Sequence, residues 1–248
     1  MRFRRINYLF LFLALSLVSY SQENIPIPRI DLGISTVETP EDLVTGLQIL
    51  IILTILTLAP AIIIMTTAFI RIIIVLHFIR QALGLQQMPP NQVLVGLTLF
   101  LTFFIMEPTI DRMIENGINP YLNQEITQAE MFSQIEIPMK EFMIKQTKVK
   151  DLELFLNISR SELPETRDET PIFVIIPAFI LSELSRGFEI GILIFIPFII
   201  IDMIVATVLM SLGMMMLPPV MISMPFKLLL FVMVDGWGLL IEMLLKSF

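Results

Sequence analysis

The chain has 248 residues, of which 56% are hydrophobic and only 16% are charged, and its formal net charge is −7. This composition is typical of an integral membrane protein. It argues against a soluble enzyme, and it provides no basic surface for nucleic acid. The sequence contains no cysteine, which excludes disulfides and thiolate metal sites.

The first 21 residues have the three-part pattern of a secretory signal peptide. Three arginines within the first five positions precede an apolar run over residues 8–18, and Ser19 and Ser21 have the spacing of a cleavage site. We therefore predict a signal peptide over 1–21 and a mature chain that starts at Gln22. An uncleaved transmembrane helix is the alternative, although the run is shorter than the ~20 residues that a span needs. Residues 22–42 contain three prolines and five acidic residues and are predicted to form a polar periplasmic linker.

Residues 43–106 are predicted to form a first membrane hairpin. Residues 43–70 carry no charge and are long enough to cross a bilayer, with Pro60 bending the helix. We expect this helix to continue through Arg71 and Arg80, which have no acidic neighbour and indicate a cytoplasmic end by the positive-inside rule. A turn over 84–90 then leads to a second span over 91–106.

The character of the sequence changes over residues 107–170. From residue 107 to 171 there are thirteen acidic and seven basic residues, and apolar residues recur at helical spacing around Phe142 and Phe155. This pattern predicts two or three amphipathic helices outside the bilayer. With two spans before it, the insert is expected to be periplasmic.

Residues 171–248 are predicted to form a second membrane hairpin. The apolar segment 171–182 is too short to span a bilayer, and it leads into Glu183, Arg186 and Glu189, which share one helical face at a spacing of three. A third span is expected over 190–212 and a fourth over 226–245.

A methionine-rich segment separates these last two spans. Met214, Met215 and Met216 lie between Gly213 and a proline pair at 218–219, which predicts a non-helical loop at membrane depth. Such backbone survives in a membrane only where protein buries it or where it lines a cavity. We therefore expect the three methionines to seal a closed channel, one loop from each protomer. The alternative is that they fill gaps in a core.

Eight charged residues lie in or beside the apolar segments. Because charge in hydrocarbon is costly, each should face protein, water or a partner charge, unless it only snorkels at an interface. Glu183 and Lys227 are predicted to pair between neighbouring protomers. The full set is Arg71, Arg80, Glu183, Arg186, Glu189, Asp202, Lys227 and Asp235.

Two catalytic or metal-binding interpretations are weak. Asp202 and Asp235 could suggest an intramembrane aspartyl protease, but Asp235 is better explained as a capping or paired residue at a helix start. His77 is the only histidine, so a His-rich metal site cannot be assembled.

Three long segments resemble the FliP family of flagellar type III export-gate proteins. They are ALGLQQMPPNQVLVGLTLFLTFFIMEPTID (82–111), PAFILSELSRGFEIGILIFIPFIIIDMIV (177–205) and LGMMMLPPVMISMPFKLLLFVMVDGW (212–237). The resemblance implies an all-α integral membrane protein of hairpins with kinked, broken helices, without catalytic activity or cofactor. It implies a pentameric ring or shallow helix with FliR, decorated by FliQ and adjoining FlhA and FlhB, which exports flagellar proteins across the inner membrane at the flagellar basal body.

The resemblance also implies residue roles. The family's channel gasket matches Met214, Met215 and Met216, and its plug or assembly residues match Phe142, Phe155, Glu183 and Lys227. Two alternatives stay open: the corresponding gate subunit of a virulence injectisome, and a small ion channel or transporter that acts alone.

Overall fold

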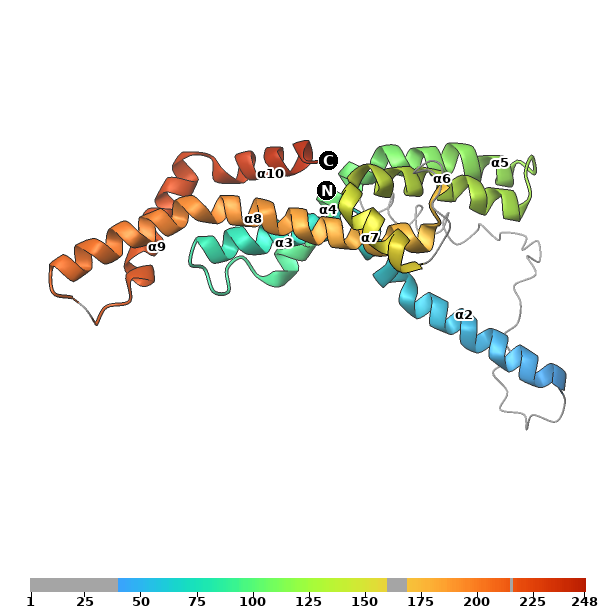
Figure 1. Ribbon diagram of the computed structural model, residues 1–248, viewed down its shortest axis with the longest axis horizontal. Helices are drawn as coiled ribbons and strands as arrows, with labels where there is room; N and C mark the ends of the chain where they lie inside the picture. Colours follow the sequence, from blue (N-terminus) through green and yellow to red (C-terminus); the bar gives the residue numbers. More distant parts are fainter. Residues whose placement is uncertain (1–39, 160–168, 215) are drawn as a thin grey trace, which may run out of the picture. The chain divides into compact units, whose positions relative to one another are not determined.

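The structure is a computed structural model that describes residues 40–159, 169–214 and 216–248. The predicted signal peptide, nearly all of the predicted linker and Met215 lie outside the described residues. The chain divides into two compact units, residues 1–51 and 52–248. All regular secondary structure in the described residues is helical (Figure 1), which confirms the predicted all-α class.

The first apolar stretch forms two helices where the sequence predicted one. Helix α2 (Pro40–Met65) ends at a break, and α3 (Phe69–Ala82) begins after it. At the break, the Thr66 hydroxyl donates to the carbonyl of Ile62 at 2.9 Å and the Thr67 hydroxyl donates to the carbonyl of Ile64 at 3.2 Å. Side chains that bond to local carbonyls in this way offer the backbone an alternative to a continuous helix. The prediction of one continuous helix through residue 80 was therefore wrong.

Helix α8 (Ile172–Ser211) is the longest of the described helices and joins two segments that the sequence analysis separated. Its 40 residues correspond to about 60 Å, twice the ~30 Å hydrocarbon thickness of a bilayer. The helix continues through Pro177 and Pro197 and through the charged turn at Glu183. About half of its length must therefore lie outside the hydrocarbon, whichever half crosses it.

Helix α3 packs against α8 through a face of small residues. Gly187 and Gly191 are four residues apart on this face, and a Cβ atom at Gly191 would lie 2.5 Å from the ring of Phe78. Small residues at such spacing let helices approach closely in membrane proteins. Side chains from α3, α8 and other helices then form one core, of which Ile72, Val75, Leu76, Ile79, Phe198, Phe231 and Leu244 are buried members.

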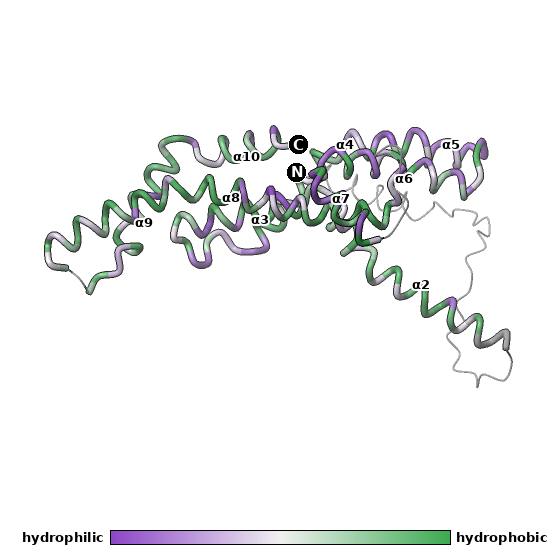
Figure 2. Tube along the Cα trace, in the orientation of Figure 1, coloured by the Kyte–Doolittle hydropathy of each residue, from purple (hydrophilic) through white to green (hydrophobic). Residues whose placement is uncertain are grey.

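A second core lies where the N-terminal part of α8 meets the insert. Its buried members include Met143, Leu152, Leu156, Ile175 and Phe179. The insert is more hydrophilic than α8 and α9 (Figure 2). Its elements are the end of α4 (Asn91–Met113), a π-helical turn η1 (Ile114–Ile118), α5 (Asn119–Leu122), α6 (Gln128–Gln146) and α7 (Val149–Ser159).

The expected fourth span is broken. Helix α9 (Pro219–Met233) and helix α10 (Gly236–Lys246) are bent by 66° at a short break. Asp235 lies at this break in the left-handed conformation, with φ of 52°. A non-glycine residue in that region cannot continue a right-handed helix, so it accounts for the bend.

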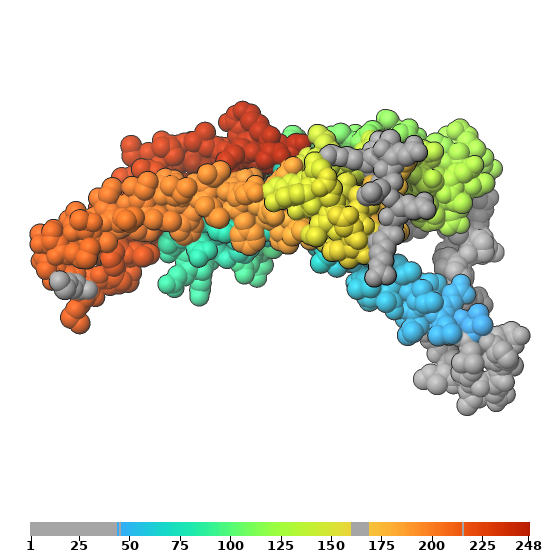
Figure 3. All heavy atoms as spheres, viewed as in Figure 1, coloured from blue at the N-terminus to red at the C-terminus, as the bar shows by residue number. Residues whose placement is uncertain are grey.

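Three helices in the described residues are long and apolar enough to cross a membrane, or four if the α9–α10 pair counts as one span. In Figure 3, the part of α8 that lies between α10 and α3 is uncovered on the face in view. Together these features describe an all-α membrane protein with long and broken helices, as predicted.

Candidate functional site

The methionine loop lies at the end of the α8–α9 hairpin (Figure 1). Gly213 has φ of 75° and donates its N–H to the carbonyl of Met210 at 3.0 Å, while Met214 donates to Leu209 at 3.0 Å. These two bonds close the last turn of α8 by the Schellman pattern, which needs a residue that tolerates positive φ. On the far side, Pro219 starts α9. The predicted non-helical loop is confirmed.

The side chains of this loop find few contacts within the chain. Met216 is 98% exposed and Met214 is 48% exposed. Neither residue fills the core of its own chain, so the core-filling alternative does not describe these two. Met215 lies outside the described residues.

Among the described residues, Arg71 on α3 and Glu183 on α8 are the two charged residues with no exposed surface. The guanidinium of Arg71 forms a bidentate ion pair with the Glu183 carboxylate on α8, with an Nε–Oε2 distance of 2.9 Å, and neither side chain has exposed surface. It also donates to Gln146 Oε1 at 3.0 Å and to the carbonyl of Ser247 at 2.5 Å. Its carbon Cζ lies 3.8 Å from the centroid of the Phe248 ring. Every direction of the planar guanidinium is therefore used, as buried arginines require.

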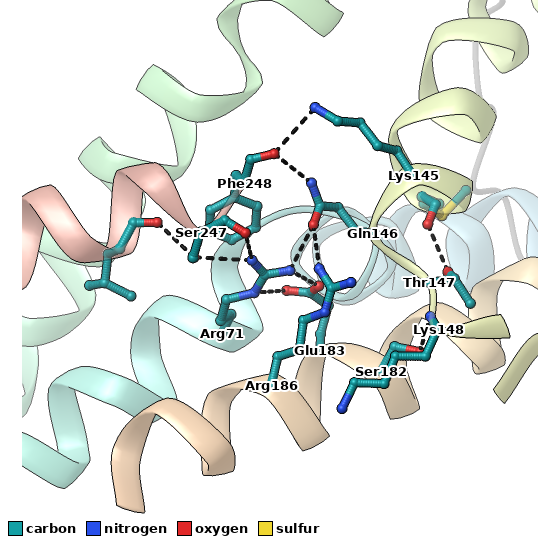
Figure 4. Close-up of polar contacts among 12 residues, drawn as sticks. Arg71, Lys145, Gln146, Thr147, Lys148, Ser182, Glu183, Arg186, Ser247 and Phe248 are labelled. Atoms are coloured by element: carbon teal, nitrogen blue, oxygen red, sulfur yellow. Dashed lines mark hydrogen bonds and ion pairs between the residues drawn. The ribbon is translucent and has the colours of Figure 1, made fainter. Parts of the chain in front are cut away.

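Neighbouring side chains complete this Arg71 cluster (Figure 4). Gln146 at the end of α6 accepts from Arg71 and, at 2.7 Å, from Arg186, and its amide nitrogen donates to the carbonyl of Phe248 at 2.9 Å. One amide thus connects α3, α6, α8 and the segment after α10. A buried polar group that is satisfied on all sides in this way specifies a single arrangement of the helices around it.

A second polar chain, beside the Arg71 cluster, attaches α7 to α8. The backbone N–H of Lys148 donates to Ser182 Oγ at 2.9 Å, and this hydroxyl donates to Asp151 Oδ2 at 2.6 Å. The Lys148 ammonium pairs with Glu189 at 2.6 Å. Arg186 and Glu189 thus contact the insert through Gln146 and Lys148, whereas Glu183 pairs with Arg71 on α3.

Lys227 on α9 forms a separate Lys227 cluster. Its ammonium lies 2.6 Å from Asp202 Oδ2 on α8 and 3.1 Å from the carbonyl of Ala82 at the end of α3. Ser223 donates to the other carboxylate oxygen of Asp202. The cluster connects both arms of the α8–α9 hairpin to α3.

The predicted pair between Glu183 and Lys227 is not formed within the chain. Glu183 pairs with Arg71, and Lys227 pairs with Asp202. Both side chains are buried, so a pair between neighbouring protomers would require them to leave these partners. The sequence showed which charges need partners but gave no helix arrangement from which to choose them, and the pair between protomers stays a prediction.

The remaining candidates are placed as follows. Phe142 packs against Phe179, with ring centroids 6.0 Å apart, and lines a cavity of about 550 Å³. Phe155 is half-buried against the second core. His77 Nδ1 lies 2.8 Å from the carbonyl of Ile73 and makes a local helix contact. Asp235 marks a helix start as expected, but its side chain makes no capping hydrogen bond.

The aspartates do not form a catalytic pair. Asp202 is engaged by Lys227 and Ser223, and no hydrogen bond joins it to Asp235 in the part of the chain that the structure describes. Among those residues no group of three acidic or histidine side chains could hold a metal ion.

Several residues of these clusters carried no sequence signal. Gln146, Ser182 and Ser247 are neutral, so a search for intramembrane charge passes over them. Asp151 could have been noticed as an acid in the first turn of an amphipathic helix, although that position alone does not predict its burial.

The comparison with known proteins agrees with the motifs. A sequence profile of the FliP family matches residues 52–244. The chain is 53% identical over 209 residues to the flagellar biosynthetic protein FliP of Bacillus subtilis (strain 168), a match that covers 84% of this chain and 95% of that relative. The protein of the same name from Caulobacter vibrioides is 52% identical over 201 residues (81% and 76% of the two chains), and that from Aquifex aeolicus is 46% identical over 224 residues (90% and 92%). The chain therefore belongs to the FliP family.

Proposed function

We propose that this protein is a subunit of the flagellar type III export gate, a channel through which flagellar proteins cross the inner membrane at the basal body. In this role five copies assemble with FliR and FliQ, next to FlhA and FlhB, and the protein performs no covalent chemistry. Family membership supports the flagellar role, since its relatives are named flagellar biosynthetic proteins.

The observation that carries the proposal is the exposed methionine loop between two apolar helices. Irregular backbone at membrane depth must be covered by protein or line a cavity, because lipid cannot satisfy its polar groups. Met214 and Met216 are left exposed by their own chain, so several copies that bring these loops together would both cover the backbone and close a pore. Methionine suits such a seal, because its flexible side chain fills irregular gaps and yields to a passing polypeptide. An apolar constriction also stops ions by dewetting.

Exposed apolar side chains outside the expected spans support assembly with other chains. Phe173 and Phe188 lie in the N-terminal half of α8 and are exposed, as are Phe132 and Ile158 in the insert. In water, surfaces of this kind mark protein–protein contact. Phe142, which lines the cavity beside α4, and Phe155 are the further positions at which we expect neighbouring subunits to touch.

The test separates a seal from a merely structural loop. Met214, Met215 and Met216 are replaced together by alanine, and ring yield and ion leakage across the inner membrane are both measured. We expect normal rings that leak. A matched control replaces Met203 and Met233, which are exposed on the helices and not on the loop, and should leave the membrane tight. Normal rings that stay tight in the triple variant would remove the proposed seal.

A further inference from the structure

A polar cavity of about 470 Å³ lies at the C-terminal end of α3. The side chains and backbone of α3, the turn that follows it and the first turn of α9 all contribute to its wall. The turn and α9 are in contact there, since a Cβ atom at Gly84 would lie 3.6 Å from Val220. The residues that line it are His77, Arg80, Gln81, Gly84, Leu85, Gln86 and Val220.

Arg80 has no acidic partner in the described part of the chain. It donates to Asn91 Oδ1 at 2.5 Å and to the carbonyl of Pro89 at 3.4 Å, which are both neutral. The sequence has no acidic residue between Asp42 and Glu107 and none in α9, and Asp202 on α8 is engaged by Lys227. A half-buried guanidinium keeps its charge and has five N–H donors, so an anion is the ligand that its surroundings lack.

The backbone around the cavity does not repel an anion. A helix C-terminus normally presents free carbonyls and partial negative charge. Here Leu85 donates to the carbonyl of Arg80 at 3.2 Å and Gly84 donates to that of Gln81 at 3.0 Å, while Lys227 caps Ala82. The last carbonyls of α3 are therefore satisfied, and the positive φ of 77° at Gly84 makes this closure possible.

The amides of Gln81 and Gln86 add N–H donors to the wall of this cavity. His77 also lines it, but its Nδ1 contacts the carbonyl of Ile73 on its own helix. Arg80 and the two amides are together a donor set that suits a phosphate group.

We infer that this cavity binds the phosphate group of an anionic phospholipid. The cavity is bordered by apolar side chains at Leu85 and Val220, and Met221 beside it is exposed, so acyl chains would find apolar surface next to the headgroup. Arg80 marks this end of α3 as cytoplasmic by the positive-inside rule, and the cytoplasmic leaflet is the one rich in anionic lipid. The inference needs only a membrane location and is independent of the channel role.

The test titrates the purified full chain in detergent with dioleoyl-phosphatidylglycerol, with dioleoyl-phosphatidylcholine and with inorganic phosphate. Bound lipid is counted by native mass spectrometry, and the melting temperature is recorded. We expect tighter binding and a larger thermal shift with phosphatidylglycerol than with phosphatidylcholine. Arg80→Gln should weaken phosphatidylglycerol binding about five- to tenfold, whereas Arg80→Lys should retain most of it.

Two further variants serve as a second test of the site and as a control. Gln86→Glu places a negative charge in the cavity at an exposed position, so it should abolish the phosphatidylglycerol preference even if Arg80→Gln does not fold. Arg112→Gln, which removes an exposed cation paired with Glu141, should change nothing. Equal binding of the two lipids, or a preference that survives both Arg80→Gln and Gln86→Glu, would overturn the inference. If inorganic phosphate alone reproduces the shift and displaces the lipid preference, the site is one for free anions and the lipid assignment is wrong.

Discussion

The two halves of α8 differ in how many of their side chains find packing and hydrogen-bond partners within the chain. The N-terminal half packs against α3, α6 and α7, and fewer of its large apolar side chains are exposed than in the C-terminal half. Its polar side chains at Ser182, Glu183 and Arg186 all find partners within the chain. The C-terminal half leaves large apolar side chains exposed, and it ends on a loop whose Met214 and Met216 fill no core of their own chain. The exposed side chains of this half include Ile192, Leu193, Ile200, Met203 and Ile204.

This difference separates residues that stabilise the subunit itself from residues that require contact with lipid or with another chain. A buried and satisfied polar cluster makes the helix arrangement unique, but it offers no surface to a partner. An exposed apolar helix gains nothing from its own chain and is stable only against lipid or protein. Variants of the buried polar residues in the first half should therefore change folding, and variants of the methionine loop that follows the second half should change permeability.

The largest effect is expected from Arg71. Arg71→Met leaves Glu183 buried without its partner, which typically costs about 3–5 kcal/mol in the free energy of unfolding. The measurement is the unfolding transition in mixed detergent micelles. The matched control, Arg112→Met, breaks a pair whose side chains are about half exposed and should cost at most about 1 kcal/mol. Equal losses for the two variants would contradict the enclosed character of this half.

The Lys227 cluster should show a smaller effect, because Asp202 is 25% exposed and reaches water. Lys227→Met is expected to cost about 2 kcal/mol. A double-mutant cycle tests the partner directly: Lys227→Met with Asp202→Asn should show a clear coupling energy, whereas Lys227→Met with Glu183→Gln should be additive within about 0.5 kcal/mol. Coupling in the second cycle and not in the first would restore the pair predicted from the sequence.

The close contact between α3 and α8 gives a third comparison. Gly191→Ala forces a methyl group into the ring of Phe78 and should destabilise the protein by about 1–3 kcal/mol. A Cβ atom at Gly96 on α4 would meet nothing within 4 Å, so Gly96→Ala should be neutral or should stabilise the helix by up to about 1 kcal/mol. Both are read from the same unfolding transition. A neutral Gly191→Ala would show that Phe78 can move aside.

How far the sequence predicts the structure follows from the same physics. The break at Gly213 and Pro218 was predictable because glycine and proline restrict the backbone locally. The continuity of α8 through Glu183 was not, because a charged turn ends a span only when its charges lack partners, and Arg71 lies 112 residues away in the sequence. The split between α2 and α3 was missed because Thr66 and Thr67 are uncharged and therefore did not interrupt the predicted span. The sequence therefore predicted where glycine and proline break a helix, but it did not predict which charged residues on distant helices pair.

The smallest effect is expected in the insert, at the start of α6. Thr127 and Glu130 form a capping box: the backbone N–H of Thr127 donates to the Glu130 carboxylate at 2.8 Å, and the Glu130 N–H donates to Thr127 Oγ1 at 3.3 Å. The backbone N–H of Thr127, and then its hydroxyl, favour the charged carboxylate and hold the pKa of Glu130 below its ordinary value.

Because the folded pKa is the lower one, this stabilisation is fully present above the ordinary pKa of glutamate and is lost as the pH falls through the lowered pKa. The melting temperature of the wild type should therefore fall more between neutral and acidic pH than that of Glu130→Gln, which has no charge to lose. Glu136→Gln on the same helix serves as the control and should follow the wild type, because Glu136 takes no part in the capping box. Thr127→Ala removes the cap at every pH, at a typical cost of about 1 kcal/mol. If Glu130→Gln and Glu136→Gln respond to acid alike, the carboxylate of Glu130 does not support the helix start.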